Sequence, residues 1–263
     1  MILIFDIDGV VRDVSRSYRR AIADTVEHYT QTAYRPTMAD IDTLKSEGIW
    51  NNDWEASQEL IHRYGESQGQ PREHHPIDYP QLIKFFQSRY FGTNPETWDG
   101  YITTEPLLLS LDYLHTLSDN NIAWGFFSGA TRGSAEYVLV HRLGIENPVI
   151  VAMEDAPSKP DPTGLFATIE QLEQQHQFAD NTPVFYAGDT VADMYTITKA
   201  QEKQPQRPWI GVGVLPPHVQ GETERSEAYS SKLEDAGASL VVKQITELTP
   251  EVLRGFQSYM TSG

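Results

Sequence analysis

The sequence predicts an α/β fold: a doubly wound parallel sheet with an all-helical domain inserted after its first strand. Residues 2–5 are an apolar run of the kind that forms a short strand buried on both faces. From about residue 106 onward, strand-like runs alternate with helical patterns, which indicates right-handed crossovers and helices on both faces of the sheet. We therefore assign residues 1–12 and 104–263 to an α/β core and residues 13–103 to a helical domain.

The expected core elements follow in chain order. Pro106 opens a helix with Leu107, Leu111 and Leu114 on one face, and a strand follows over 122–127. The later elements are a helix over 132–143 that ends at Gly144, a strand over 148–152, a helix with Leu165, Ile169 and Leu172 aligned, a strand over 184–187, a helix over 192–200, a strand over 209–214, a polar loop rich in Glu and Ser, an edge strand over 240–242 and a helix near 250–260.

The inserted segment shows helical periodicity and almost no strand-like runs. The three apolar patterns that carry this periodicity are Ala21, Val26 and Tyr29; Leu60, Ile61 and Tyr64; and Leu82, Phe85, Phe86 and Tyr90. Residues 68–80, with three prolines and paired histidines, are expected to form a loop between two of these helices.

Composition limits the classes of function. The 263 residues contain no cysteine, which excludes disulfides, thiolate metal sites and a cysteine nucleophile. No apolar stretch approaches the roughly 18 residues of a membrane span, and no cationic flank precedes the first strand, so a cytoplasmic enzyme is expected. The net charge of −17 argues against a nucleic-acid or membrane partner. It does not exclude a phosphorylated substrate, because screening over about 8–10 Å leaves binding to the local site.

Two aspartates follow the first strand. Asp6 and Asp8 are succeeded by Gly9, at the carboxyl end of a strand, where open α/β sheets place their ligands. Two carboxylates beside a glycine suit a hard cation and a nucleophile in one pocket. A surface turn is the alternative for this segment taken alone.

Three further segments repeat this arrangement of polar residues. Ser128 and Gly129 follow the strand over 122–127, and Lys159 lies between turn-forming residues before a helix. Asp189 ends the strand over 184–187 in a Gly-Asp pair, and Asp193 follows four residues later. Individually, Ser128 suits a helix cap, Lys159 an exposed loop and Asp193 the first turn of a helix. The joint pattern indicates catalysis.

In order, spacing and placement these segments resemble the haloacid dehalogenase superfamily of Mg-dependent phosphoaspartyl phosphatases. The four motifs of that family are DxD, a Ser or Thr after an apolar strand, a Lys, and GDxxxD, and all four are intact in this sequence. A helical domain inserted after the first motif resembles the cap of the subgroup that contains phosphoglycolate phosphatase. The resemblance implies Mg²⁺ as cofactor and a small phosphorylated metabolite as substrate.

The resemblance also implies a role for each motif residue. Asp6 is the nucleophile and a metal ligand, while Asp8 is the general acid and then base, with its carbonyl on the metal. Ser128, Gly129 and Lys159 bind the phosphoryl group. Asp189 is a direct metal ligand, and Asp193 acts on the metal through water or holds Lys159. Haloacid dehalogenases that cleave carbon–halogen bonds lack the aspartate at position 8, so Asp8 favours phosphate esters.

Two weaker patterns concern the substrate. Arg132, four residues after Ser128, is a candidate clamp for a second anionic group, or else a solvated helix arginine. In the helical domain, Trp50, Asn51, Asn52 and Trp54 form a candidate specificity loop, because polar contacts discriminate analogues well. The alternative for this loop is a tight turn and helix N-cap flanked by core tryptophans.

The leading interpretation is a Mg²⁺-dependent phosphatase of a small phosphomonoester, acting as a monomer or homodimer. One alternative is a phosphomutase, in which the phosphoenzyme returns its phosphate to a sugar. The other is a non-catalytic binding protein on the same fold, a class that typically loses one of the acidic or lysine positions, all of which are present in this chain.

Overall fold

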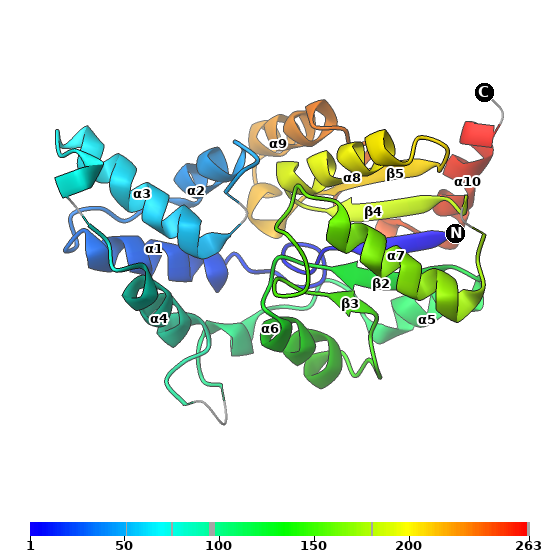
Figure 1. The fold of residues 1–263 in the computed structure, drawn as a ribbon, viewed down its shortest axis with the longest axis horizontal. Coiled ribbons are helices and arrows are strands. Elements are labelled where there is room, and N and C mark those ends of the chain that lie inside the picture. The colour runs from blue at the N-terminus through cyan, green and yellow to red at the C-terminus, as the bar shows by residue number, and fades with distance from the viewer. Residues whose placement is uncertain (51, 75, 95–97, 180, 262–263) are drawn as a thin grey trace. The chain divides into compact units, whose positions relative to one another are not determined.

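The computed structural model describes residues 1–263 except 51, 75, 95–97, 180 and 262–263, and describes only the backbone of 74 and 257–261. The chain divides into two compact units (Figure 1). The first comprises Met1–Asp13 and Leu107–Gly263, and the second comprises Val14–Pro106. We call them the sheet unit and the helical unit.

The sheet unit is built on six parallel strands in the order β3-β2-β1-β4-β5-β6. The strands are β1 (Ile2–Phe5), β2 (Ala123–Phe127), β3 (Ile150–Val151), β4 (Val184–Gly188), β5 (Trp209–Val214) and β6 (Leu240–Val242). The predicted doubly wound parallel sheet is therefore confirmed, with β6 at one edge as expected.

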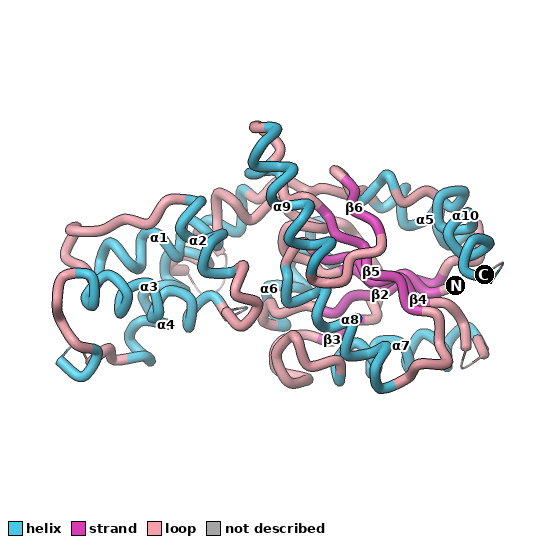
Figure 2. The backbone as a smooth tube through the Cα atoms, turned by 90° about the horizontal axis from the view of Figure 1, so that it is seen from above, coloured by secondary structure: helices cyan, strands magenta, loops and turns pink. Residues whose placement is uncertain are grey.

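Helices cover both faces of this sheet (Figure 2). They are α5 (Leu111–Asp119), α6 (Arg132–Glu136), α7 (Thr163–His176), α8 (Val191–Lys203), α9 (Thr223–Asp235) and α10 (Pro250–Thr261). Because side chains alternate along a strand, Ile2 and Ile4 pack with α7 and α8, while Leu3 and Phe5 pack with α5, α6 and α10.

Three expectations for the sheet unit differ from the structure. Helix α5 begins at Leu111 rather than Pro106, because Ser110 is the N-cap and accepts a hydrogen bond from the Tyr113 amide. The helix expected over 132–143 is α6 followed by a π-helix, Tyr137–Arg142. The polar loop expected after β5 is wrong, since α9 occupies most of it. Leu233 is the one buried residue of α9, so this helix has no apolar stripe to reveal it.

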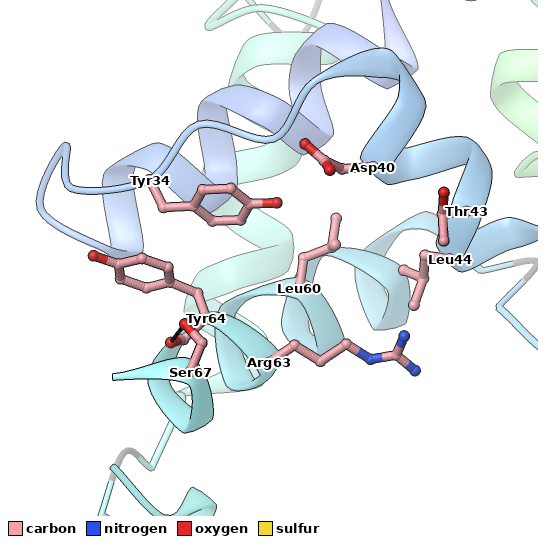
Figure 3. Close-up of a pocket in the computed structure, with 8 residues that line it drawn as sticks. All are labelled: Tyr34, Asp40, Thr43, Leu44, Leu60, Arg63, Tyr64 and Ser67. Atoms are coloured by element: carbon pink, nitrogen blue, oxygen red, sulfur yellow. Dashed lines mark hydrogen bonds between the residues drawn. The ribbon is translucent and has the colours of Figure 1, made fainter. Parts of the chain in front are cut away.

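The helical unit contains no strand among its described residues. Its helices are α1 (Tyr18–Tyr29), α2 (Met38–Lys45), α3 (Asp53–Ser67), α4 (Tyr79–Tyr90) and two short 3-10 helices, Arg72–His74 and Tyr101–Thr104. Helices α1, α3 and α4 pack together, and the Tyr18 ring stacks on Tyr90 with centroids 3.9 Å apart. Figure 3 shows a pocket of this unit, lined by Tyr34, Asp40, Thr43, Leu44, Leu60, Arg63, Tyr64 and Ser67.

Candidate active site

The candidate site lies where the strand order of the sheet reverses. Successive strands run outward from β1 on one side to β2 and β3, and on the other side to β4, β5 and β6. Asp6 directly follows β1, and its amide donates to the Ala187 carbonyl of β4 at 2.8 Å. Asp189 directly follows β4. Ligands of open α/β sheets bind at this switch point, beyond the carboxyl ends of the strands.

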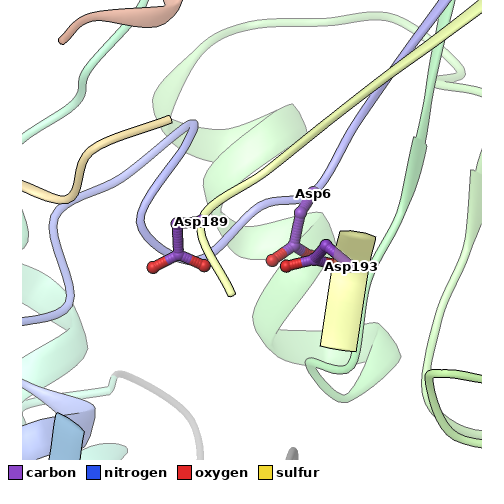
Figure 4. Close-up of side chains that lie close together, drawn as sticks. All are labelled: Asp6, Asp189 and Asp193. Atoms are coloured by element: carbon purple, nitrogen blue, oxygen red, sulfur yellow. The ribbon is translucent and has the colours of Figure 1, made fainter. Parts of the chain in front are cut away.

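Three carboxylates converge at this point. Each of Asp6, Asp189 and Asp193 offers an oxygen within 4.8 Å of those of the other two, and all three side chains are buried (Figure 4). Buried charges of one sign repel strongly unless a cation lies between them. A set of hard oxygen donors suits Mg²⁺ better than a softer transition metal. The donor set therefore fits the cofactor that the sequence predicts.

Lys159 is the cation that the chain itself supplies to this cluster. Its Nζ lies 2.7 Å from Asp6 Oδ1 and 2.7 Å from Asp193 Oδ1, and its side chain is buried. The ammonium also lies over two rings, 5.2 Å from the centroid of Phe127 and 5.5 Å from that of Tyr186. Lys159 is thus fixed by both charge and packing rather than exposed in a loop.

Both carboxylate oxygens of Asp193 accept hydrogen bonds from other residues of the chain. Oδ1 accepts from Lys159 and from the Tyr186 hydroxyl, each at 2.7 Å. Oδ2 accepts from the Thr190 amide at 3.0 Å and the Thr190 hydroxyl at 2.7 Å, which forms a capping box at the start of α8. Asp193 is therefore both a first-turn helix residue and the residue that holds Lys159, a geometry that favours Asp6 and Asp189 over Asp193 as direct metal ligands.

The absence of a side chain at Gly9 leaves room for the Asp189 carboxylate. The backbone of Gly9 has a φ of +80°, and a Cβ at this position would lie 2.1 Å from Asp189 Oδ2. Only glycine permits both the backbone conformation and the contact. From the other side, the Tyr229 hydroxyl of α9 donates to the Asp189 carbonyl at 2.9 Å. Sequence reasoning missed Tyr229, because it lies in the helix that gave no apolar pattern.

Burial and charge set the proton affinities of the cluster. Burial, together with the charges of Asp193 and Asp8, raises the pKa of Asp6 from 3.8 to about 7, although Lys159 acts to lower it. Burial acts to lower the pKa of Lys159, but the carboxylates of Asp193 and Asp6 raise it above its ordinary value. Burial acts to raise the pKa of Asp193, yet Lys159 lowers it below its ordinary value. Asp6 is therefore the more readily protonated carboxylate of the two, and a further cation beside it would lower its pKa.

Asp8 lies outside the acidic cluster and has a different partner. Its side chain is 24% exposed, and its Oδ1 accepts a hydrogen bond from Arg12 Nε at 2.6 Å. Arg12 is fully buried. Arg12 was not among the residues predicted from the sequence, although an arginine directly after the apolar pair Val10 and Val11 and four residues from Asp8 is a signal that could have found it.

Ser128 follows β2, the neighbour of β1, and is buried. Its Oγ accepts from the Ala130 amide at 3.1 Å, which closes the turn after the strand. The N-cap of α6 is Thr131, so Ser128 does not cap that helix. Gly129 is half-buried beside it. The serine is thus held at the carboxyl end of β2 by the turn.

Arg132 is engaged by surface carboxylates. Its Nη2 donates to Asp155, its Nη1 lies 3.4 Å from Glu136, and its amide donates to Glu154 at 2.9 Å. The side chain is 40% exposed. These contacts fit the solvated helix arginine better than the predicted anion clamp.

The candidate specificity loop of the helical unit has its polar atoms used locally. Trp50 Nε1 donates to Glu47 at 2.7 Å. Asn52 caps α3 by accepting from the amides of Trp54 and Glu55, and Asn51 lies outside the described residues. These contacts fit a tight turn and N-cap, with Trp54 half-buried.

Comparison with known proteins agrees with the fold. The family model of haloacid dehalogenase-like hydrolases matches residues 1–201. A curated relative named imidazoleglycerol-phosphate dehydratase, from Phytophthora nicotianae, is 30% identical over 95% of this chain. The chain spans about half of that relative, 52% of its length.

Solved structures share the fold at low sequence identity. Phosphatase Tt82 from Thermococcus thioreducens has a TM-score of 0.58 and 20% identity, covering 89% of this chain and 99% of its own. A protein from Thermotoga maritima named as a candidate beta-phosphoglucomutase has a TM-score of 0.55 and 17% identity, covering 97% and 98%. In the described part of the chain, no helix combines the length and apolar character needed to cross a bilayer.

Proposed function

Since the chain belongs to the haloacid dehalogenase-like hydrolases, we propose that it is a Mg²⁺-dependent phosphatase that hydrolyses a small phosphomonoester through an aspartyl-phosphate on Asp6. One observation carries this proposal. Asp6 is a buried carboxylate 2.7 Å from the Lys159 ammonium, and it shares an oxygen cluster with Asp189 and Asp193. A carboxylate in such surroundings can attack phosphorus because its charge is offset in place.

The proposed reaction has two displacements. In the first, an Asp6 oxygen attacks phosphorus, the bond from phosphorus to the ester oxygen breaks, and Asp8 gives its proton to the departing alkoxide. In the second, Asp8 takes a proton from water, the water oxygen attacks phosphorus, and the Asp6–phosphorus bond breaks to release inorganic phosphate. Asp8 ends each cycle protonated, so the chain is unchanged.

Ser128, Gly129 and Lys159 are assigned to the phosphoryl group. The Ser128 hydroxyl and the Gly129 amide would donate to its non-bridging oxygens, and Lys159 would link that group to Asp6. Asp6, Asp189 and the Asp8 carbonyl would hold the metal, with Asp193 acting by holding Lys159. When bound, Mg²⁺ neutralises charge on the phosphoryl oxygens and on Asp6.

The substrate class is proposed from two sources. The helical unit is assigned to substrate selection by its likeness to the caps of the family, with Trp50, Asn51, Asn52 and Trp54 as the residues to test. The curated relative has a phosphomonoester, imidazoleglycerol phosphate, in its name. We therefore place imidazole-bearing phosphomonoesters first in a substrate panel, beside small sugar and polyol phosphates. Action in the cytoplasm stays a prediction.

The test is phosphate release from this panel with Mg²⁺ present. Activity is expected in the wild type, reversible loss with EDTA, and no measurable turnover in Asp6→Asn with its fold intact by circular dichroism. Turnover in Asp6→Asn, or full activity in EDTA, would contradict the proposal.

A phosphomutase is the second candidate, favoured by the fold shared with the Thermotoga maritima protein. Conversion of a hexose 1-phosphate only after priming with a bisphosphate, without net phosphate release, would establish it. A binding protein without catalysis would bind a phosphate ester and release no phosphate under any of these conditions.

A further inference from the structure

Arg12 is a fully buried cation whose polar contacts include Asp8, at the candidate site, and Ser134. Its Nε and Nη2 both lie 2.6 Å from Asp8 Oδ1, so the guanidinium grips a single carboxylate oxygen. Nη2 also donates to Ser134 Oγ, in the first turn of α6, at 2.9 Å. A side chain on a loop after β1 is thus tied to both Asp8 and a helix on one face of the sheet.

The loop that carries Asp8 does not need this side chain to close. The Ile7 carbonyl accepts from the amides of Val11 at 2.8 Å and Arg12 at 3.2 Å, and the Gly9 amide donates to the Arg12 carbonyl at 2.9 Å. These backbone bonds fix the course of the chain over residues 7–12. The guanidinium therefore adds orientation of a side chain rather than closure of the turn.

Stability alone does not account for a buried arginine at this position. The neighbouring residues Val10 and Val11 are buried apolar core residues. Replacing a buried ion pair with well-packed apolar side chains is often neutral or stabilising, because the desolvation of the charges is avoided. At the same time Asp8 remains 24% exposed. Arg12 holds this carboxylate from its buried side while leaving part of it accessible.

We infer that Arg12 is a positioning residue, which with Ser134 orients the Asp8 carboxyl for proton transfer to the leaving oxygen. The inference rests on the proposed phosphatase function. Arg12 itself touches no reacting atom. It fixes the rotamer of Asp8 so that, as the phosphorus–oxygen bond breaks, the proton of Asp8 meets the departing alkoxide.

This role predicts a dependence on the leaving group. An alkoxide needs a proton as it departs, whereas a nitrophenolate leaves readily without one. Loss of the Asp8 orientation should therefore slow the hydrolysis of alkyl phosphates far more than that of p-nitrophenyl phosphate. A general loss of folded protein would slow both esters by the same factor.

The experiment compares kcat/KM for p-nitrophenyl phosphate with that for the best alkyl phosphate of the panel. General acid catalysis contributes about 10²–10⁴-fold, so Arg12→Met is expected to cost about 30-fold or more on the alkyl ester and about threefold or less on the aryl ester. Arg12→Lys should recover part of the loss, since lysine keeps the charge without the fork. Ser134→Ala should also lose more kcat/KM on the alkyl ester than on the aryl ester, with a smaller fold-change than Arg12→Met.

Two variants provide the reference points. Asp8→Asn should show the same leaving-group pattern at full size. Arg207→Met breaks the ion pair between the buried Arg207, just before β5, and the partly buried Glu173 of α7. This pair lies in the same unit, at the opposite end of the strands from the site. The variant should leave the ratio of the two esters unchanged.

An equal loss on both esters in Arg12→Met, with the Asp8→Asn pattern intact, would overturn the inference. A crystal structure of Arg12→Met gives an answer that does not depend on activity. A displaced Asp8 carboxylate supports the inference, and an unmoved one overturns it. Absence of phosphate release from the wild type would instead count against the proposed function.

Discussion

The two units of this protein use the same chemical device, a cation between two carboxylates, in opposite surroundings. In the sheet unit, Lys159 lies between Asp6 and Asp193 with all three side chains buried. In the helical unit, Arg72 lies between the buried Glu59 and the exposed Glu66, and 45% of the Arg72 side chain is itself exposed. Exposed pairs add little to stability because water and salt screen them. Buried charges are costly to desolvate, so a cluster of them indicates function rather than stability.

Removal of each cation in turn tests whether burial decides how much the cation contributes to stability. Lys159→Met leaves two buried carboxylates without their partner, so we expect a loss of about 3 kcal/mol or more in unfolding free energy and no phosphatase activity. Arg72→Met should cost about 1 kcal/mol or less. Urea unfolding in EDTA measures both. Similar losses of unfolding free energy in the two variants would show that burial does not decide the contribution of these cations.

Gly9→Ala tests how tightly the site is built. The new Cβ would clash with the Asp189 side chain. The backbone at residue 9 would also have to keep a positive φ, which alanine disfavours. We expect at least a tenfold loss of kcat/KM and weaker Mg²⁺ binding by calorimetry. Gly144→Ala is the matched control, because Gly144 has a φ of +76° and nothing within 4 Å of a Cβ. It should cost about 1–2 kcal/mol of stability and leave Mg²⁺ affinity unchanged. Equal Mg²⁺ affinities in Gly9→Ala and Gly144→Ala would contradict the close approach of residue 9 to Asp189.

The pH dependence of stability tests the raised pKa of Asp6. Because its pKa is about 7 in the folded protein against 3.8 ordinarily, the folded state binds more protons than the unfolded state between these values. The contribution of Asp6 to unfolding free energy therefore falls as pH rises from about 4 to 7. In EDTA, the Tm of Asp6→Asn minus that of the wild type should increase between pH 5 and pH 8. A difference that stays constant with pH would contradict the shift.

Arg132→Ala gives the smallest expected effect. The side chain is half-exposed and engaged by Asp155 and Glu136, so we expect KM to change by less than about twofold and stability by about 1 kcal/mol or less. A clear rise in KM confined to substrates with a second anionic group would restore the clamp that the sequence predicts.

The sheet was predictable because its strands carry strong apolar runs, each followed by turn residues. The polar residues at the ends of β1, β2 and β4 were found for the same reason, since Asp6, Ser128 and Asp189 each interrupt such a run. Helix α9 was missed because a polar surface helix has no apolar period to detect. The start of α5 was predicted too early, at Pro106, whereas the Ser110 N-cap begins the helix at Leu111.

By itself the sequence determined where the polar residues of the candidate site lie, because Asp6, Ser128 and Asp189 each follow an apolar run that local hydrophobicity marks as a strand. Only the tertiary structure decided how they are paired. The contacts of Arg12 with Ser134, Lys159 with Asp193 and Tyr229 with Asp189 join segments 34 to 122 residues apart. Such pairings depend on packing across the whole sheet unit, which local sequence patterns do not encode.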